Sequence, residues 1–167
     1  MQKTLHNFAF IDSQNLNLGI KQLGWAMDYR KFRIYLKEKY GVETAYLFIG
    51  YMPQNQALYT RLQEYGYVLV FKPVLEKKDG TVKGNVDAEL VLQAMIDYEK
   101  YEKAVIVSSD GDFACLASYL YGKDKLEKVI SPRQQTCSIL LKKASKEKIV
   151  FIDNLRQKLE YKKKNTA

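Results

Sequence analysis

The stretch AVIVSSDGDFACL, residues 104 to 116, places Asp110 and Asp112 directly after an apolar run that is typical of a buried strand. A second apolar run begins immediately after the two acids, so they sit at the junction between two buried segments. A carboxylate near a protein core is costly unless a hydrogen-bonding group or an opposite charge pairs with it. We therefore expect these two aspartates to have a partner.

Apolar segments of strand type alternate with helical patterns along the rest of the chain. Strands are expected at residues 7–11, 43–50, 67–75, 103–109, 125–131 and 148–153. Helices are expected at residues 27–41, 55–65, 86–101, 113–121, 136–144 and 154–161. Residues 76–85 are polar and contain glycine, which predicts a loop. The alternation predicts an α/β fold: a mostly parallel central sheet of five to six strands, covered by helices on both faces.

This topology brings four aspartates to one edge of the sheet. In an open α/β sheet the carboxyl ends of the strands and the starts of the following helices share an edge. Asp12 ends the first strand, Asp87 begins the helix before the fourth strand, and Asp110 and Asp112 follow that fourth strand. If the first and fourth strands are neighbours, a crevice lies between them, where ligands usually bind.

Four carboxylates in one crevice would repel one another unless cations were present. The partner of the two aspartates is therefore most simply a divalent metal ion. Oxygen ligands without histidine or cysteine favour Mg²⁺ or Mn²⁺.

The composition argues against other kinds of site. His6 is the only histidine, and Cys115 and Cys137 have no close-spaced cysteine or histidine companion, so neither a zinc site nor a histidine-based triad is expected. We expect no disulfide in a cytoplasmic protein. The net charge of +8 and the pI near 9.3 favour a polyanionic partner, with nucleic acid ahead of a membrane surface.

Several familiar motifs are missing from the sequence. It contains no P-loop and no GxGxxG after the first strand, and an EF-hand loop starting at Asp110 would have Tyr121 instead of glutamate at its twelfth position. No apolar run approaches the roughly 20 residues that a membrane helix needs. We expect a soluble, cytoplasmic protein with one domain over residues 1–160 and a solvated basic tail at 161–167.

Each polar residue also has a simpler explanation. Asp87 could complement a helix dipole, and Ser109 with Asp112 has the spacing of a capping box. Asn15 could cap a helix, or it could hold a metal-binding carboxylate or a phosphate oxygen in place. Lys83 could contact a phosphate or be a solvated loop lysine. The doublet of Asp110 and Asp112 is the feature that capping does not require.

Three motifs together carry a resemblance to a known family. FIDSQNL (10–16), KGNVDAELVLQAM (83–95) and VIVSSDGDFACL (105–116) occur in this order in the chain. In sequence and spacing they resemble the NYN domain, and within it the LabA-like (DUF88) proteins of the PIN-like nuclease superfamily. The likeness covers about residues 5 to 153.

The resemblance implies a PIN-like three-layer sandwich whose acidic cluster binds Mg²⁺ or Mn²⁺ and hydrolyses RNA phosphodiester bonds. It implies catalytic and metal-binding roles for four aspartates, Asp12, Asp87, Asp110 and Asp112. It implies substrate-binding or supporting roles for four further residues, Asn15, Lys83, Ser108 and Ser109. Two serines, Ser13 and Ser109, stand where many relatives have glycine, which bears on substrate fit more than on metal binding.

The primary hypothesis is thus a metal-dependent ribonuclease in which basic surface residues hold the RNA. The alternative is a non-catalytic module of the same fold that binds RNA or a protein partner in a regulatory role. A third candidate, a metal-dependent phosphatase acting on small phosphoesters, would use the same acids. The natural RNA, the choice between endo- and exonucleolytic cleavage, the number of metal ions and the formation of a homodimer stay open at this point.

Overall fold

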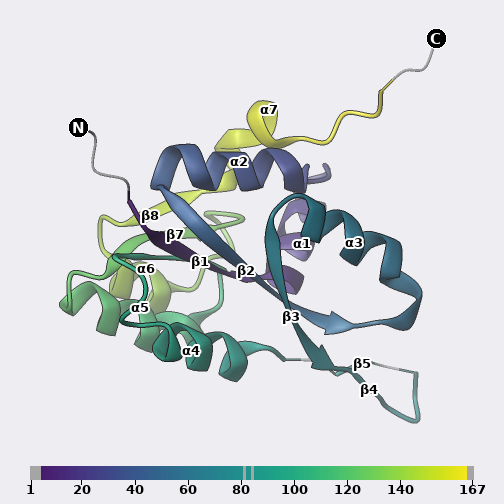
Figure 1. The fold of residues 1–167 in the computed structure, drawn as a ribbon, viewed down its shortest axis with the longest axis horizontal. Helices are drawn as coiled ribbons and strands as arrows, with labels where there is room; N and C mark the ends of the chain where they lie inside the picture. Colours follow the sequence, from purple (N-terminus) through teal and green to yellow (C-terminus); the bar gives the residue numbers. More distant parts are fainter. Residues whose placement is uncertain (1–4, 81, 84, 165–167) are drawn as a thin grey trace.

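The computed structural model describes residues 5–80, 82–83 and 85–164, without the side chains of residues 76, 82 and 83. Its centre is a six-stranded sheet in the order β3-β2-β1-β6-β7-β8 (Figure 1). All neighbouring strands in this sheet run parallel. The strands are β1 (Asn7–Asp12), β2 (Val42–Tyr51), β3 (Tyr67–Pro73), β6 (Ala104–Val107), β7 (Leu126–Ser131) and β8 (Ile149–Phe151). The predicted α/β class and the parallel sheet are confirmed.

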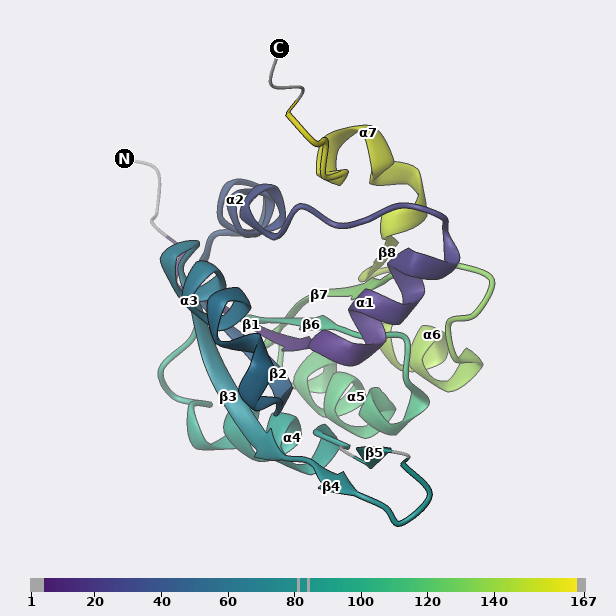
Figure 2. The same ribbon diagram turned by 90° about the vertical axis from the view of Figure 1, so that its right-hand side faces the viewer.

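Helices cover both faces of the sheet, which gives three layers (Figures 1 and 2). One face carries α1 (Ser13–Gln22), α2 (Tyr29–Tyr40), α3 (Gln56–Glu64) and α7 (Arg156–Leu159). The other face carries α4 (Asp87–Ile96), α5 (Ala114–Gly122) and α6 (Ile139–Ser145). Short 3₁₀ turns precede three of these helices, at η1 (Pro53–Asn55), η2 (Gly111–Phe113) and η3 (Ile152–Leu155).

Two hydrophobic cores result from the alternation of side chains along the central strands. In β1, Ala9 and Ile11 belong to the core under α1 and α2, whereas Phe10 belongs to the core under α4 and α5. Val105 and Ile106 of β6 divide in the same way. Strands buried on both faces read as continuous apolar runs, which is why β1 and β6 were recognisable in the sequence.

The strand order changes direction at the middle of the sheet. The chain moves outward from β1 through β2 to β3 and then returns to place β6 on the other side of β1. The expected neighbourhood of the first and fourth strands of this sheet is therefore confirmed. The carboxyl ends of β1 and β6 flank the crevice at which open α/β sheets usually bind ligands.

Several predicted elements differ from the structure in extent. The helix α1 was not predicted as a separate element, because Leu16, Leu18 and Ile20 occupy every second position, a spacing that does not indicate a helix. The predicted helix at 86–101 ends at Ile96, and the predicted helix at 136–144 begins only at Ile139, after Ser138 has capped it. The predicted helix at 154–161 is a 3₁₀ turn followed by the short α7.

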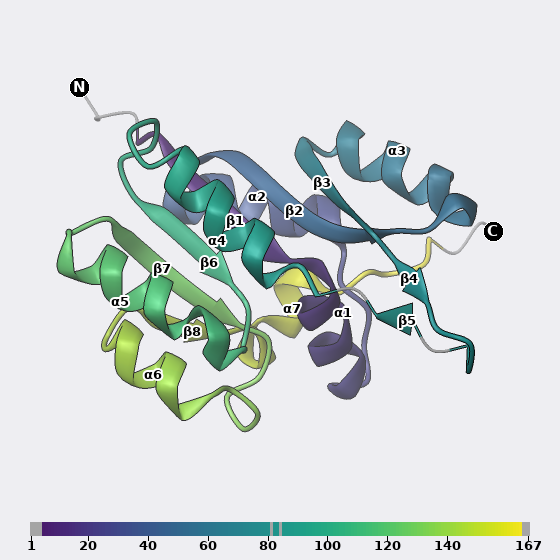
Figure 3. The same ribbon diagram turned by 90° about the horizontal axis from the view of Figure 1, so that it is seen from below.

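The predicted loop at 76–85 is in part a hairpin. Leu75–Glu76 (β4) pairs antiparallel with Val82–Lys83 (β5), and this hairpin projects beyond the sheet next to the start of α4 (Figure 3). Pro73 ends β3, which is the edge strand of the main sheet, as predicted.

None of the described helices combines the length and the apolar character needed to cross a membrane. Cys115, which is exposed, and Cys137, which is buried, are both free.

Candidate metal centre

Three carboxylates meet at the carboxyl edge of the sheet. Asp87, Asp110 and Asp112 can each place an oxygen within 4.8 Å of the others. Asp87 is the first residue of α4, whereas Asp110 and Asp112 lie in the turn between β6 and α5. Two segments that are more than 20 residues apart in sequence therefore supply one acidic cluster.

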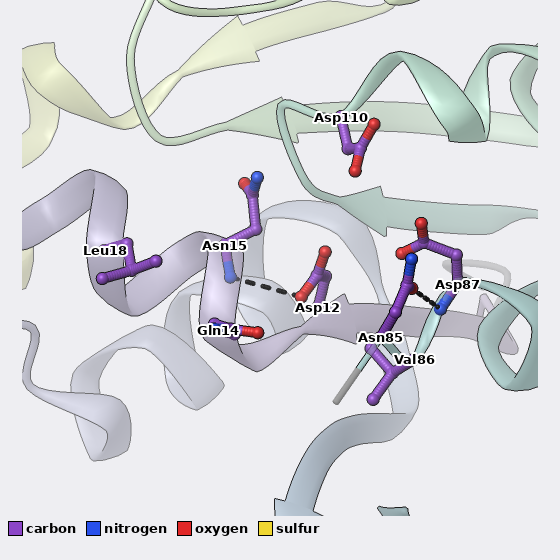
Figure 4. Close-up of a pocket in the computed structure, with 8 residues that line it drawn as sticks. All are labelled: Asp12, Gln14, Asn15, Leu18, Asn85, Val86, Asp87 and Asp110. Atoms are coloured by element: carbon purple, nitrogen blue, oxygen red, sulfur yellow. Dashed lines mark hydrogen bonds between the residues drawn. The ribbon is translucent and has the colours of Figure 1, made fainter. Parts of the chain in front are cut away.

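A fourth carboxylate, that of Asp12, lies beside this cluster at the end of β1. Side-chain alternation directs Asp12 to the same face as Phe10, the face covered by α4 and α5. Asp12 is 6% exposed, whereas the other three aspartates are half-buried or exposed. Asp12 and Asp110 line one pocket together with Asp87 (Figure 4).

Hydrogen bonds hold Asp12 in place from both sides of the crevice. The backbone N–H of Asn15 donates to Oδ1 of Asp12 at 3.2 Å, so Asp12 is the N-cap of α1. The hydroxyl of Ser108 donates to Oδ2 at 3.3 Å. The same hydroxyl oxygen accepts the N–H of Asp110 at 3.1 Å, which links the carboxylate of β1 to the loop after β6.

Asn15 joins the same two loops a second time. Its Oδ1 accepts the backbone N–H of Ser109 at 2.9 Å and the hydroxyl of Ser109 at 3.0 Å. Asn15 therefore does not cap α1 with its side chain. It ties the start of α1 to the residue directly before Asp110.

The alternative explanation of Ser109 and Asp112 as a capping box does not hold, because the hydroxyl of Ser109 donates to Asn15 and the N–H of Asp112 donates to Asp110. Asp110 caps the η2 turn instead, accepting the N–H of Asp112 on Oδ1 at 2.9 Å. Asp110 thus uses one oxygen locally and faces the pocket (Figure 4).

Gly111, between the two aspartates, is required by close packing. A Cβ at this position would lie 2.5 Å from Oγ and 3.2 Å from Cβ of Ser138. Ser138 also donates its backbone N–H to the carbonyl of Ser109 at 3.0 Å, so it packs closely against the acidic turn. This contact explains why a glycine separates Asp110 from Asp112.

Asn85 is a site residue that the sequence did not identify. Its Oδ1 accepts the backbone N–H of Asp87 at 2.8 Å and so positions the first residue of α4 (Figure 4). The backbone carbonyl oxygen of Asn85 accepts a hydrogen bond from the ammonium group of Lys72 on β3. The same ammonium group lies 3.2 Å from a carboxylate oxygen of Glu89. An asparagine two residues before a helical aspartate is a signal of such a turn, although many turns share it.

The electrostatics of the cluster disfavour negative charge. Burial is the main reason that the pKa of Asp12 rises to about 6, and the charges of Asp87 and Asp110 add to it, against the hydrogen bonds from Asn15 and Ser108. Burial also raises the pKa of Asp87, with contributions from Asp110 and Asp112. A bound cation would relieve both effects.

The donor set fits a hard divalent cation. The pocket has a volume of about 250 Å³ and is lined by carboxylate and amide groups, with Leu18 and Val86 at its side. The cluster contains carboxylates only, which suit Mg²⁺ or Mn²⁺ better than zinc. The structure brings together seven of the eight predicted residues, while the side chain of the eighth, Lys83, lies outside the described part of the chain.

The family model of the NYN domain matches residues 8–153. This match includes all strands of the main sheet apart from Asn7, the first residue of β1, and it includes all four aspartates. The chain belongs to the NYN domain family. An NYN domain thus combines a nuclease-like fold with a cluster of aspartates in this protein.

Two individual proteins resemble this NYN domain. The low amplitude and bright protein LabA of Synechococcus elongatus is 29% identical over 132 residues, which cover 73% of this chain and 71% of LabA. The predicted place among LabA-like NYN proteins is confirmed. A crystal structure of a protein of unknown function from Vibrio parahaemolyticus superposes with a TM-score of 0.78 at 21% identity, covering 95% of this chain and 99% of the other. That likeness shows a shared fold.

Proposed function

We propose that this NYN domain is a metal-dependent ribonuclease that hydrolyses RNA phosphodiester bonds. The observation that carries the proposal is the convergence of Asp87, Asp110 and Asp112 within 4.8 Å beside the buried Asp12, in a family with a nuclease-like fold. The excess of 27 lysines and arginines over 19 acids supports a polyanionic substrate.

The four aspartates would hold one or two Mg²⁺ or Mn²⁺ ions. An ion held there would lower the pKa of a water molecule and neutralise charge that develops on the phosphate and the leaving oxygen. The chain itself positions these groups: hydrogen bonds made by Ser108 and Asn15 hold Asp12 and the loop of Asp110 next to each other. The only histidine, His6, is exposed and bonded to Glu43, so carboxylates are the proton-accepting groups at the pocket.

The test is cleavage of labelled single-stranded and structured RNAs by the purified protein in Mg²⁺, Mn²⁺ or EDTA. Asp110→Asn should abolish metal-dependent cleavage, a loss of at least about a hundredfold, with the circular dichroism spectrum unchanged. Asp124→Asn is the matched control, because Asp124 is exposed and pairs with Lys103, and this variant should cleave at the wild-type rate.

Other outcomes would replace the proposal. Full activity of Asp110→Asn would exclude the cluster as the catalytic centre. RNA binding without cleavage by the wild type would indicate a non-catalytic RNA-binding module. Hydrolysis of mononucleotides but not of oligomers would indicate a phosphatase.

A further inference from the structure

Three hollows on the surface, the first of which is the acidic pocket, adjoin one another through shared lining residues and together mark a path. The second hollow, here called the central pocket, has a volume of about 390 Å³ and lies between the start of α1, the end of β2 and α3. It shares Gln14 with the acidic pocket. The third hollow, here called the basic groove, has a volume of about 670 Å³ and shares Tyr29, Leu58 and Leu62 with the central pocket.

The basic groove is lined by cations from three separate segments. They are Arg30 at the start of α2, Arg61 on α3, and Lys162, Lys163 and Lys164 after α7. None of these five makes an ion pair with another residue in the described part of the chain. The single acid in the lining, Asp28, uses Oδ1 to cap α2. With five cations and one acid in its lining, the groove carries net positive charge.

The segment after α7 is attached to the domain where it enters the groove. Tyr161 donates its N–H to the carbonyl of Ala26 at 2.9 Å, and Asp28 donates its N–H to that of Leu159 at 2.8 Å. Lys31 donates to the carbonyl of Glu160 at 2.9 Å. In Figure 1 this segment passes above α1 and α3 toward the C-terminus. The expected solvated tail is thus anchored at its first residue, Tyr161.

The groove and the central pocket also offer surfaces for bases. Tyr29, Tyr65 and Tyr161 line the groove among its cations. The central pocket is lined by three residues with side-chain amides, Gln14, Asn17 and Asn55, together with apolar residues. No other described residue hydrogen-bonds to these three amides, so they are free for the polar edge of a base. Aromatic faces, free amides and cations along one path are the features by which proteins hold single-stranded nucleic acid.

We propose that this path is the binding track for single-stranded RNA, with one base in the central pocket and the adjoining phosphates in the basic groove. The inference rests on the proposed function for its direction, since the track begins at the acidic pocket. A duplex keeps its bases stacked inside and could not place one in the central pocket, so the track selects single strands.

The test is the affinity of a labelled 12-nucleotide RNA, measured by fluorescence anisotropy in EDTA so that metal-dependent cleavage cannot occur. Replacing Lys162, Lys163 and Lys164 with glutamine should weaken binding roughly tenfold at low salt. It should also reduce the slope of log K against log salt by about 2, since each lost phosphate contact contributes about 0.7. Arg61→Gln should weaken binding in the same direction.

A matched control removes the same charge elsewhere. Lys37 and Lys39 lie in the last turn of α2, and Lys143 lies in the last turn of α6. Both helices end just before a strand begins, so these exposed lysines lie toward the opposite edge of the sheet. The triple change to glutamine there should leave the affinity within about twofold of the wild type, because these lysines contact no phosphate. Equal losses in the two triple variants, or no loss in either, would overturn the track.

The placement of one base in the central pocket is tested separately, with RNAs that lack a single base. A single abasic position moved along the RNA should lower the affinity about five-fold to a hundredfold at one or two positions, as expected for the loss of one stacked base. Equal affinity at all positions would overturn this part of the proposal. Asp110→Asn separates the two proposals: in EDTA it should bind the RNA at least as tightly as the wild type, because the change removes a negative charge, while it fails to cleave RNA in Mg²⁺ or Mn²⁺. If the wild type cleaves RNA while the groove variants bind RNA as tightly as the wild type, the proposed ribonuclease activity stands and the proposed track is wrong.

Discussion

Two buried aspartates on the same side of the sheet have opposite surroundings. Asp97 follows the last residue of α4 and is 1% exposed, and Asp12 is 6% exposed. Asp97 accepts hydrogen bonds from Tyr46 at 2.6 Å, Gln93 at 2.8 Å and Lys100 at 2.8 Å. The carboxylate of Asp97 is therefore saturated with donors, one of which is a cation.

Asp12 receives fewer and longer hydrogen bonds than Asp97. It receives two hydrogen bonds, at 3.2 and 3.3 Å, and its charged neighbours are the carboxylates of Asp87 and Asp110. Burial alone would raise the pKa of either acid. At Asp97 the bonds from Lys100, Tyr46 and Gln93 outweigh burial and lower the pKa, whereas at Asp12 burial prevails and the pKa rises to about 6.

The comparison separates an acid that stabilises the fold from an acid that serves the site. A carboxylate that stabilises the fold has its counter-charge within the chain, whereas Asp12 lacks one among the described residues. The two ends of α4 illustrate this difference. Asp87 is the first residue of the helix and belongs to the acidic cluster, whereas Asp97 follows the last residue and is surrounded by hydrogen-bond donors. This contrast supports an external cation at Asp12.

The largest expected effect is on stability at Asp97. Asp97→Ala should lower the free energy of unfolding by about 3 to 4 kcal/mol, because Tyr46 and Gln93 lose a buried acceptor. Asp12→Ala, measured in EDTA at pH 7.5, should stay within about 1 kcal/mol of the wild type, because losing the cap of α1 is offset by removal of a buried charge. Urea unfolding followed by circular dichroism measures both. Equal losses would show that the two acids have the same role.

The stabilisation that a bound metal ion gives should also distinguish Asp12 from Asp97. Adding Mn²⁺ at one hundred times its Kd should stabilise the wild type by about 2.7 kcal/mol, because the ion binds only the folded protein. Asp97→Ala should keep this increment from its lower baseline, while Asp12→Asn and Asp110→Asn should lose most of it. Thermal unfolding with and without Mn²⁺ gives the increments. A full increment in Asp110→Asn would place the ion elsewhere.

The sequence predicted the strands and the meeting of the four acids well, because both follow from local patterns. Strands such as β1 and β6 are apolar throughout, and parallel topology carries Asp12 and Asp110 to one edge. The helix α1 was harder to recognise, since it buries only Ser13, Leu16 and Ile20.

What the sequence could not show are contacts between distant residues. Ser109 matches a capping box locally, yet its hydroxyl bonds to Asn15, 94 positions away. The distinction between Asp12 and Asp97 is of the same kind, because Tyr46 lies 51 positions from Asp97. Residue type and spacing locate an acid at an element's end, but its partners come from tertiary packing.

The smallest of these effects is the pH dependence of the metal-free protein. The pKa of Asp12 is about 6 in the folded state against 3.8 for an ordinary aspartate, so the folded state binds the proton more tightly. The contribution of Asp12 to stability is therefore fully present below pH 3.8 and is lost as the pH rises through 6, by on the order of 2 kcal/mol. Asp97, with its lowered pKa, contributes in the opposite sense, since its stabilisation is lost as the pH falls. Subtracting the curve of Asp12→Asn from that of the wild type in EDTA isolates the first effect. A flat difference between pH 4 and 7.5 would mean that Asp12 carries no unfavourable charge, and the case for an external cation would then rest on the other three carboxylates alone.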